Sequence, residues 1–194
     1  TDMTIQKIYW WFRTLFYKPF FKKLGKHSYI GKPLTIRNYK GITVGSRVRI
    51  YPYARIEVIN KGSSIIFEDN ISIGQCFHIV SAGRLIIKKN TTISANVFMT
   101  NVDHSYKDID VHIMKQNIVI KTTTIGENCY IGYGAVIQAG TLLGRQCIVG
   151  ANSVVRGEFP DYCVIVGSPA KIIKRYDKAQ KEWKRTDEKG RLLE

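Results

Sequence analysis

The segment TNVDHSYKDIDVHIMKQNI, residues 100–118, gathers side chains whose types could do chemistry. Within a short stretch it brings together Asp103, His104, Asp108, Asp110 and His112. A histidine titrates near neutral pH and can take a proton from an attacking group as a general base. Imidazoles and carboxylates can also hold a metal ion, provided that rigid elements make three or more of them converge. The segment is therefore a candidate site, and its chemistry depends on the elements that hold it.

A period of six residues dominates the chain downstream of this segment. An aliphatic residue stands at every sixth position, in the series Ile125, Ile131, Ile137, Leu143, Val149 and Val155. A small residue stands four positions after each of the first five, in the series Cys129, Ala135, Thr141, Cys147 and Ser153. Six is neither the period of a helix nor the alternation of a single strand. It predicts an all-β solenoid with three short strands per coil, aliphatic side chains inward and small ones at tight corners.

The same period extends upstream in three triplets. These are Val44, Ile50 and Ile56; Phe67, Ile73 and Ile79; and Ile87, Ile93 and Met99. Residues 100–118 then break the register, and Val119 resumes it. We expect about six coils of roughly 18 residues, stacked about 4.8 Å apart. A polar excursion of this length from a regular solenoid is usually functional rather than architectural.

Length and charge restrict the organisation of the chain. Its 194 residues fit one domain with short terminal additions. The net charge is +15, and residues 1–41 hold nine Lys and Arg against one acidic residue. This asymmetry favours an anionic partner, whether phosphate, an acidic glycan or a membrane surface, although a solvated basic surface also explains it.

The four cysteines, at positions 76, 129, 147 and 163, have the spacing of neither a disulfide framework nor a zinc site. We therefore expect reduced, buried thiols and a cytosolic compartment. No secretory signal is evident, and no uncharged run reaches the roughly 18 residues of a membrane span.

Three features together resemble a known family. They are the six-residue pattern, the excursion containing Asp103 and His104, and the ending FPDYCVIVGSPAKIIKRY at residues 159–176. The chain is similar to the hexapeptide-repeat acyltransferases, most of all to the lipopolysaccharide and capsule sugar O-acetyltransferases, which are related to the maltose and galactoside acetyltransferases. The resemblance implies a left-handed parallel β-helix, a homotrimer, and active sites between adjacent subunits. It divides the chain into an N-terminal helix (1–27), a β-helix (28–170) and a basic tail (171–194).

The resemblance also implies an acetyl-CoA-dependent transfer to a sugar hydroxyl of a cell-surface glycan, without a metal. His104 stands where the family places its catalytic base. Asp103 could orient His104, contact the acceptor or only solvate the loop. Tyr106 and Asp108 could line the acceptor cleft, and Gln75 lies near the position where the maltose branch carries an asparagine.

Further residues would hold the donor, acetyl-CoA, if the family pattern applies. Backbone amides at Tyr133 and Gly134 could stabilise the oxyanion, and Tyr130 could flank the thioester or instead cap the trimer seam. Gly150 and Ala151 would contact the pantetheine arm. The cations Arg156, Lys171 and Lys174 would hold its phosphates, or alternatively form a basic surface strand.

The basic, aromatic head, residues 5–26, is a separate motif. Helical spacing relates Ile5, Ile8, Phe12, Leu15 and Phe16, and Trp11 widens this stripe. Such a helix suits the interface of a membrane, which residues 5–24 could contact from the cytoplasmic side. It could equally cover the open end of the solenoid or pack on a trimer neighbour.

Two other functions fit the same architecture. One is a metalloenzyme like the hexapeptide-repeat carbonic anhydrases, with ligands from the excursion and His78. The other is a non-catalytic binding protein that uses a flat face of the solenoid. A nucleic-acid partner is not expected, because the aromatic residues are not interleaved with basic ones on strands.

Overall fold

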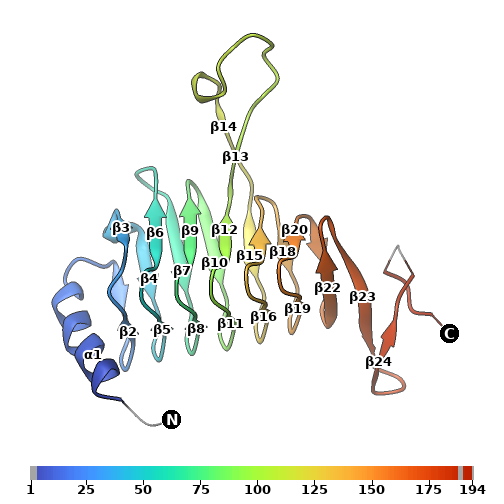
Figure 1. Cartoon of the computed structure of the whole chain (residues 1–194), viewed down its shortest axis with the longest axis horizontal. Helices are drawn as coiled ribbons and strands as arrows, with labels where there is room; N and C mark the ends of the chain where they lie inside the picture. Colours follow the sequence, from blue (N-terminus) through green and yellow to red (C-terminus); the bar gives the residue numbers. More distant parts are fainter. Residues whose placement is uncertain (1–3, 188–189, 194) are drawn as a thin grey trace.

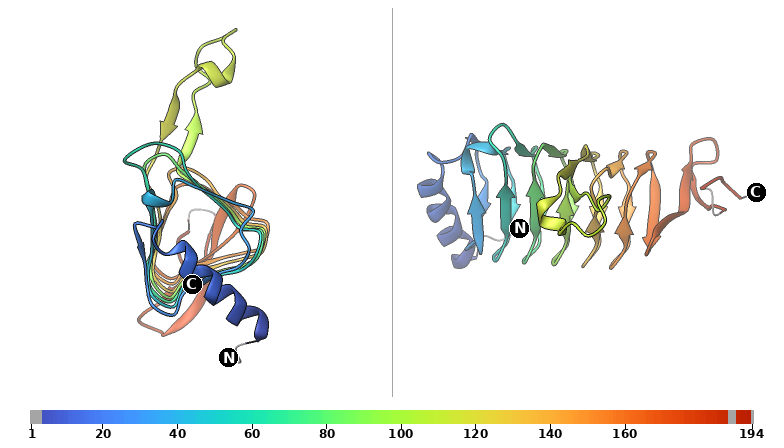
Figure 2. Two further views of the ribbon diagram at one scale, coloured as in Figure 1. Left: turned by 90° about the vertical axis from the view of Figure 1, so that its left-hand side faces the viewer. Right: turned by 90° about the horizontal axis from the view of Figure 1, so that it is seen from above.

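The protein is described by a computed structural model that covers residues 4–187 and 190–193. One helix, α1 (Ile5–Tyr17), precedes a β-solenoid with the cross-section of a triangle (Figures 1 and 2). Each coil passes through sheet A, sheet B and sheet C in turn, so the prism has an A–B, a B–C and a C–A corner. No helix in the described ranges is long and apolar enough to cross a membrane.

The strands of the three sheets are short and parallel within the coils. Sheet A contains β1 (Lys23–Leu24), β4 (Ile42–Val44), β7 (Ser64–Phe67), β10 (Arg84–Ile87), β15 (Thr123–Ile125), β18 (Leu142–Leu143) and β21 (Glu158–Phe159). Sheet B contains β2 (Tyr29–Ile30), β5 (Arg49–Ile50), β8 (Ser72–Ile73), β11 (Thr92–Ile93), β16 (Tyr130–Ile131), β19 (Ile148–Val149) and β22 (Cys163–Gly167). Sheet C contains β3 (Thr35–Arg37), β6 (Arg55–Val58), β9 (His78–Ser81), β12 (Phe98–Thr100), β17 (Val136–Ile137) and β20 (Val154–Val155).

The period of six matches the coil as predicted. The aliphatic residues of the downstream series point inward and are buried, and Ile131 lies opposite Val149 as Ile137 lies opposite Val155. The five small residues are buried too. Glycine is required after Ile125 because a Cβ on Gly126 would lie 2.1 Å from the carbonyl oxygen of Gly144 in the next coil. The pattern thus records both the core and the close stacking of the corners.

The solenoid starts one coil earlier than the sequence predicted. Sheet A has seven strands, of which β1 precedes the first predicted triplet. Leu24, Ile30 and Ile36 carry this coil, and they too are six residues apart.

Helix α1 covers the open end of the first coil through one face only (Figure 2). The hydroxyl of Thr14 accepts the backbone N–H of Ile30 (2.8 Å) and donates to the carbonyl of Trp10 (2.7 Å). A guanidinium nitrogen of Arg13 donates to the carbonyl of Ile30 (3.1 Å). Trp10 packs against Tyr29, with ring centroids 6.0 Å apart. The helix therefore satisfies both backbone groups of an edge strand that would otherwise face outward.

A two-stranded arm interrupts the solenoid at the C–A corner, as the excursion predicted. It consists of β13 (Val102–His104), a tip with the 3₁₀ helix η2 (Ile113–Lys115), and β14 (Ile118–Ile120), which pairs antiparallel with β13. Figure 1 shows the arm standing away from the body of the prism. The buried amide of Gln116 donates to the carbonyls of Asp108 (3.0 Å) and Val111 (2.9 Å) and so orders the tip.

The chain closes with a hairpin rather than a further coil. Strand β23 (Ala170–Asp177) turns back antiparallel on β22, and β24 (Glu182–Arg185) pairs with β23. Three of the four cysteines are buried, but Cys76 is exposed, so the prediction of four buried thiols is wrong at that position. Cys76 lies at the B–C corner with a φ of 57°, outside the small-residue positions of the repeat.

Candidate active site

A groove of about 380 Å³ lies at the root of the arm, on the outer face of sheet C. Its walls combine apolar strand residues with polar residues from the arm and the C–A corner. They are Ile59, Val80, Phe98, Thr100, Val102, Asp103, His104, Val136, Gln138, Ala139 and Arg156. The groove therefore contains both residues that the sequence singled out in the excursion.

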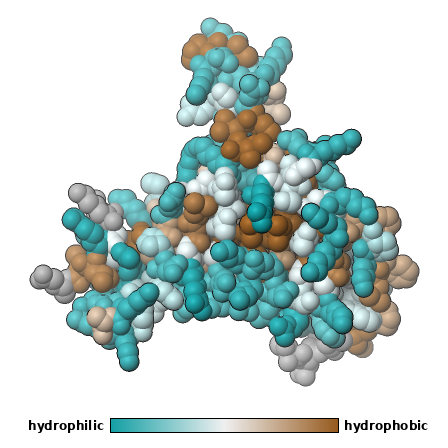
Figure 3. Space-filling view, turned by 180° about the vertical axis from the view of Figure 1, so that it is seen from behind, coloured by the Kyte–Doolittle hydropathy of each residue, from teal (hydrophilic) through white to brown (hydrophobic). Residues whose placement is uncertain are grey.

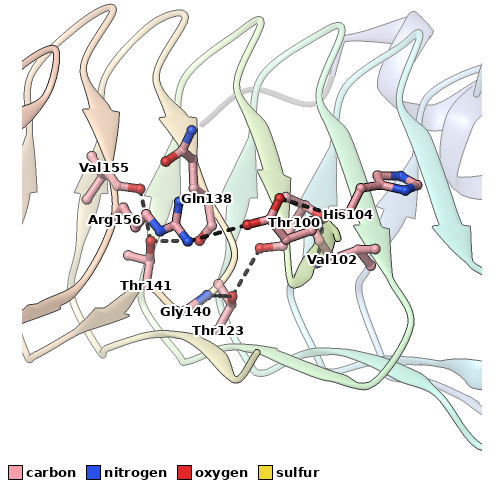
Figure 4. A network of polar contacts seen from close by, with 10 residues as sticks. Thr100, Val102, His104, Thr123, Gln138, Gly140, Thr141, Val155 and Arg156 are labelled. Atoms are coloured by element: carbon pink, nitrogen blue, oxygen red, sulfur yellow. Dashed lines mark hydrogen bonds and ion pairs between the residues drawn. The ribbon is translucent and has the colours of Figure 1, made fainter. Parts of the chain in front are cut away.

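The carboxylate of Asp103 connects the arm to the solenoid. One oxygen lies 3.3 Å from a guanidinium nitrogen of Arg156, and the other accepts the backbone N–H of His104 at 3.0 Å (Figure 4). Asp103 therefore positions the arm and the main chain of His104. The guanidinium of Arg156 belongs to this groove, and not to the sheet on which Lys174 lies.

The imidazole of His104 is exposed at the end of β13. Figure 4 shows the ring pointing away from Arg156. In the described part of this chain no side chain accepts or donates a hydrogen bond at the ring of His104. A base with a free ring at the rim of a groove is open to an incoming hydroxyl.

Buried threonines hold the corner from which the arm leaves. The hydroxyl of Thr123 donates to the carbonyl of Thr100 (3.0 Å) and accepts the N–H of Gly140 (3.2 Å). One coil further, the hydroxyl of Thr141 donates to the carbonyl of Val155 (2.9 Å; Figure 4). These bonds join successive coils beneath the groove and fix the angle at which the arm departs.

The residues expected to hold the donor lie on a different part of the prism. Tyr130, Ile148, Val164 and Lys174 follow one another in register across sheet B, on β16, β19, β22 and β23. The phenol of Tyr130 shares a hydrogen bond with the hydroxyl of Ser94 (3.1 Å). Gly150 and Ala151 occupy the B–C corner beside this row, and Lys171 lies on β23.

The two backbone amides expected to stabilise an oxyanion differ from one another. The N–H of Gly134 already donates to the carbonyl of Ala95 (3.1 Å). The N–H of Tyr133 has no acceptor among residues 4–187 and 190–193. An amide that is free at an exposed corner is the better oxyanion donor of the two.

The expected acceptor residues are divided between two corners. Gln75 is exposed at the B–C corner, whereas Tyr106 and Asp108 are exposed near the tip of the arm. One chain therefore does not bring Gln75 to His104. The sequence did not single out Gln138, which lines the groove; its signal was a long polar residue where the repeat has glycine.

A polar cluster also lies on the outer face of sheet C. The carboxylate of Glu57 is 2.7 Å from Nε of Arg55 and 3.2 Å from Nε2 of His78, which stacks on Phe98. Burial opposes ionisation of Glu57, but the hydrogen bonds from Arg55 and His78 outweigh it, so its pKa is lowered. Within the described ranges no three His, Cys, Asp or Glu side chains converge as metal ligands would.

Comparison with known proteins agrees with this architecture. A family described as bacterial transferase hexapeptide (six repeats) matches residues 122–157. WbbJ of Escherichia coli K12, named for an O-acetyl transferase of lipopolysaccharide biosynthesis, is 33% identical over 160 residues, which cover 79% of this chain and 81% of WbbJ. The N-acyltransferase AntD from Bacillus cereus, solved with dTDP and coenzyme A, has a TM-score of 0.72 at 19% identity and covers 87% of this chain and 91% of its own.

Galactoside acetyltransferase, solved in complex with coenzyme A, has a TM-score of 0.59 at 20% identity, covering 100% of this chain and 82% of that one. At such identities these two structures show the fold, whereas the likeness to WbbJ over most of both chains shows the family. The chain belongs to the hexapeptide-repeat acyltransferases, and its solenoid is a left-handed parallel β-helix.

Proposed function

We propose that the protein transfers an acetyl group from acetyl-CoA to a sugar hydroxyl of a cell-surface glycan, such as lipopolysaccharide O-antigen, capsule or a lipid-linked precursor. The observation that carries this proposal is the free imidazole of His104 at the rim of the groove. The name of WbbJ supports the class of acceptor, and the coenzyme A complexes of AntD and galactoside acetyltransferase support the donor.

The reaction needs a single direct displacement. His104 takes the proton of the acceptor hydroxyl while its oxygen attacks the thioester carbonyl carbon. The resulting oxyanion is stabilised by backbone N–H groups, for which the amide of Tyr133 is the best candidate. The C–S bond then breaks, the proton on His104 passes to the leaving thiolate, and the products are an acetyl ester and free CoA.

The donor is proposed to lie along sheet B and the B–C corner. Tyr130, Gly150 and Ala151 would contact the thioester end and the pantetheine arm. Lys171 and Lys174 on β23 would meet the phosphates as point charges. Arg156, which binds Asp103, would act by holding the arm rather than by holding a phosphate.

The split of these residues between two corners supports a homotrimer. His104 and its groove lie at the C–A corner, whereas Gln75, Tyr133 and Gly150 lie at the B–C corner. An adjacent copy can supply the second set. The tip of the arm, with Ile109 81% and Met114 72% exposed, offers an apolar surface for such a contact.

Release of CoA from acetyl-CoA, measured by chromatography with and without envelope glycans as acceptor, tests the function. Wild type should release CoA in an acceptor-dependent manner, and His104→Ala should lower kcat by about 10²- to 10⁴-fold. His112→Gln is the matched control on the same arm and should retain activity, since the amide oxygen can accept the Met114 N–H as the ring now does. Full activity of His104→Ala, or failure of wild type to bind CoA, would overturn the proposal.

A further inference from the structure

Helix α1 has a second face that the solenoid leaves uncovered. The apolar stripe read from the sequence is the outward face, because Trp10 and Thr14 make the contacts with the first coil. On the outward side Ile5 is 88%, Tyr9 63%, Phe12 54% and Phe16 77% exposed. Figure 3 shows apolar side chains at this end of the molecule and on the arm. A row of exposed aromatic residues on one helix face marks an interaction surface.

The charge around this face has one sign. Residues 4–56 contain no Asp or Glu. Lys18 and Lys22 flank the end of the helix, and Lys23 and Lys26 follow on the first coil, all four with exposed side chains. An apolar surface surrounded only by cations is complementary to an anionic one that has an apolar interior.

A lysine pocket lies next to the end of α1. Three lysines, Lys22, Lys40 and Lys61, line a depression of about 310 Å³ together with Asn38 and the segment Gly62–Ser64. The ammonium group of Lys40 donates to the carbonyl of Pro19 at 3.2 Å, which ties the pocket to the segment that follows the helix. No acidic side chain lines the pocket. Three ammonium groups with neighbouring hydroxyls and an amide suit the oxygens of a phosphate.

The lysine pocket and the arm lie along one edge of the prism. Lys40 and Lys61 lie between strands of sheet C and sheet A, on the segments β3–β4 and β6–β7. The arm leaves the same C–A corner between β12 and β15. In Figure 1 the helix, this edge and the arm succeed one another along the solenoid.

We propose that this end of the protein docks on an anionic phospholipid bilayer. The exposed stripe of α1 lies in the membrane interface, and the lysine pocket takes the phosphate of a lipid headgroup. The docking stands apart from catalysis. Its consequence, that His104 works close to the membrane on a lipid-linked acceptor, rests on the proposed function.

Co-sedimentation with vesicles tests the docking without any assay of activity. Wild type should bind vesicles of phosphatidylcholine with phosphatidylglycerol and should bind pure phosphatidylcholine far more weakly. Phe12→Ser with Phe16→Ser should weaken binding about tenfold or more, because two apolar side chains leave the interface. Replacing Lys22, Lys40 and Lys61 by Gln should weaken binding to the anionic vesicles roughly 100-fold, with little change for neutral ones.

Two matched controls come from the opposite end of the solenoid. Leu192→Ser with Leu193→Ser removes two exposed apolar side chains, and Gln at Lys178, Lys181 and Lys184 removes three charges. Both should leave vesicle binding within about twofold of wild type, with circular dichroism confirming the fold of all variants. Binding that is equal on neutral and anionic vesicles, or equally weakened by the controls, would overturn the proposal. So would absence of vesicle binding together with a lower molecular mass of the Phe12→Ser, Phe16→Ser variant, because α1 would then cover a second copy.

Discussion

Asp103 and Arg156, 53 residues apart in the chain, meet at 3.3 Å and join the arm to the last coil of sheet C. Both side chains are partly exposed, at 40% and 52%. An exposed pair of this kind contributes no more than about 1 kcal/mol to the stability of the fold. Its importance lies in the direction that it gives the arm, and therefore His104.

Breaking this pair should lower activity more than stability. Asp103→Asn and Arg156→Gln should each reduce kcat about 10- to 100-fold, since misplacement of a catalytic group by about 1 Å has effects of this size. The KM for acetyl-CoA should change little, and the double variant should be no worse than either single one. Steady-state kinetics and urea unfolding measure the two effects. An increase confined to the KM for acetyl-CoA in Arg156→Gln would show instead that Arg156 contacts the donor.

Alanine at Gly126 should destabilise the solenoid. The new Cβ would meet the backbone of Gly144 at 2.1–2.4 Å, and neither strand can move without disturbing its sheet. We expect a loss of about 2 kcal/mol or more in the free energy of unfolding, as in overpacked cores. Gln138→Ala is the control at the equivalent repeat position on the C–A corner and should change stability by less than about 1 kcal/mol. Equal stability of Gly126→Ala and wild type would contradict the stacking described here.

Stability should depend on the ionisation of Glu57 in acid. Its pKa is lowered in the folded protein from the ordinary value of 4.5, so the ionised form favours folding. The stabilisation is present above pH 4.5 and is lost as the pH falls through the folded-state pKa. Glu57→Gln should therefore be less stable than wild type near neutral pH by no more than about 1 kcal/mol, with the difference vanishing in acid. Thermal melting at a series of pH values measures this, and a difference that grew in acid would contradict it.

One thiol should react in the native protein. Cys76 is exposed, whereas Cys129, Cys147 and Cys163 are stacked inside the A–B corner. The hydrogen bond with Cys147 and burial raise the pKa of the Cys129 and Cys163 thiols, which suppresses the reactive thiolate. Iodoacetamide labelling followed by mass spectrometry should modify Cys76 first and the other three only on unfolding. Rapid native labelling of a Cys76→Ser variant would contradict this.

The sequence predicted the solenoid well because its core repeats. Ile125 and Ile131 differ only in which sheet they serve, so their spacing reports the length of a side of the triangle. The first coil carries the same signal in Leu24, Ile30 and Ile36, but basic and aromatic neighbours make it hard to separate from the helix. The stripe on α1 was visible in the sequence, yet its direction depended on Thr14 and Trp10 making the contacts with the first coil.

The site was predictable only in part. His104 and Asp103 stand out because they interrupt a regular pattern, whereas the ion pair to Arg156 depends on how far the arm tilts. Glycine occupies the repeat position at A–B and B–C corners, where the next coil leaves no space for a Cβ. At the C–A corner the same position holds Gln138 and Arg156, so the loss of glycine marks the open side of the prism.

The hydrogen bonds of Thr14 and Arg13 to Ile30 also set the number of coils in the molecule. A parallel ladder has no length of its own, since each coil offers the next the same row of backbone groups. The exposed edge of β2 could receive the terminal coil of another chain, and that chain a third, in an open filament. With those groups occupied at one end and β23 folded back on β22 at the other, stacking stops and a discrete enzyme results instead of a fibre.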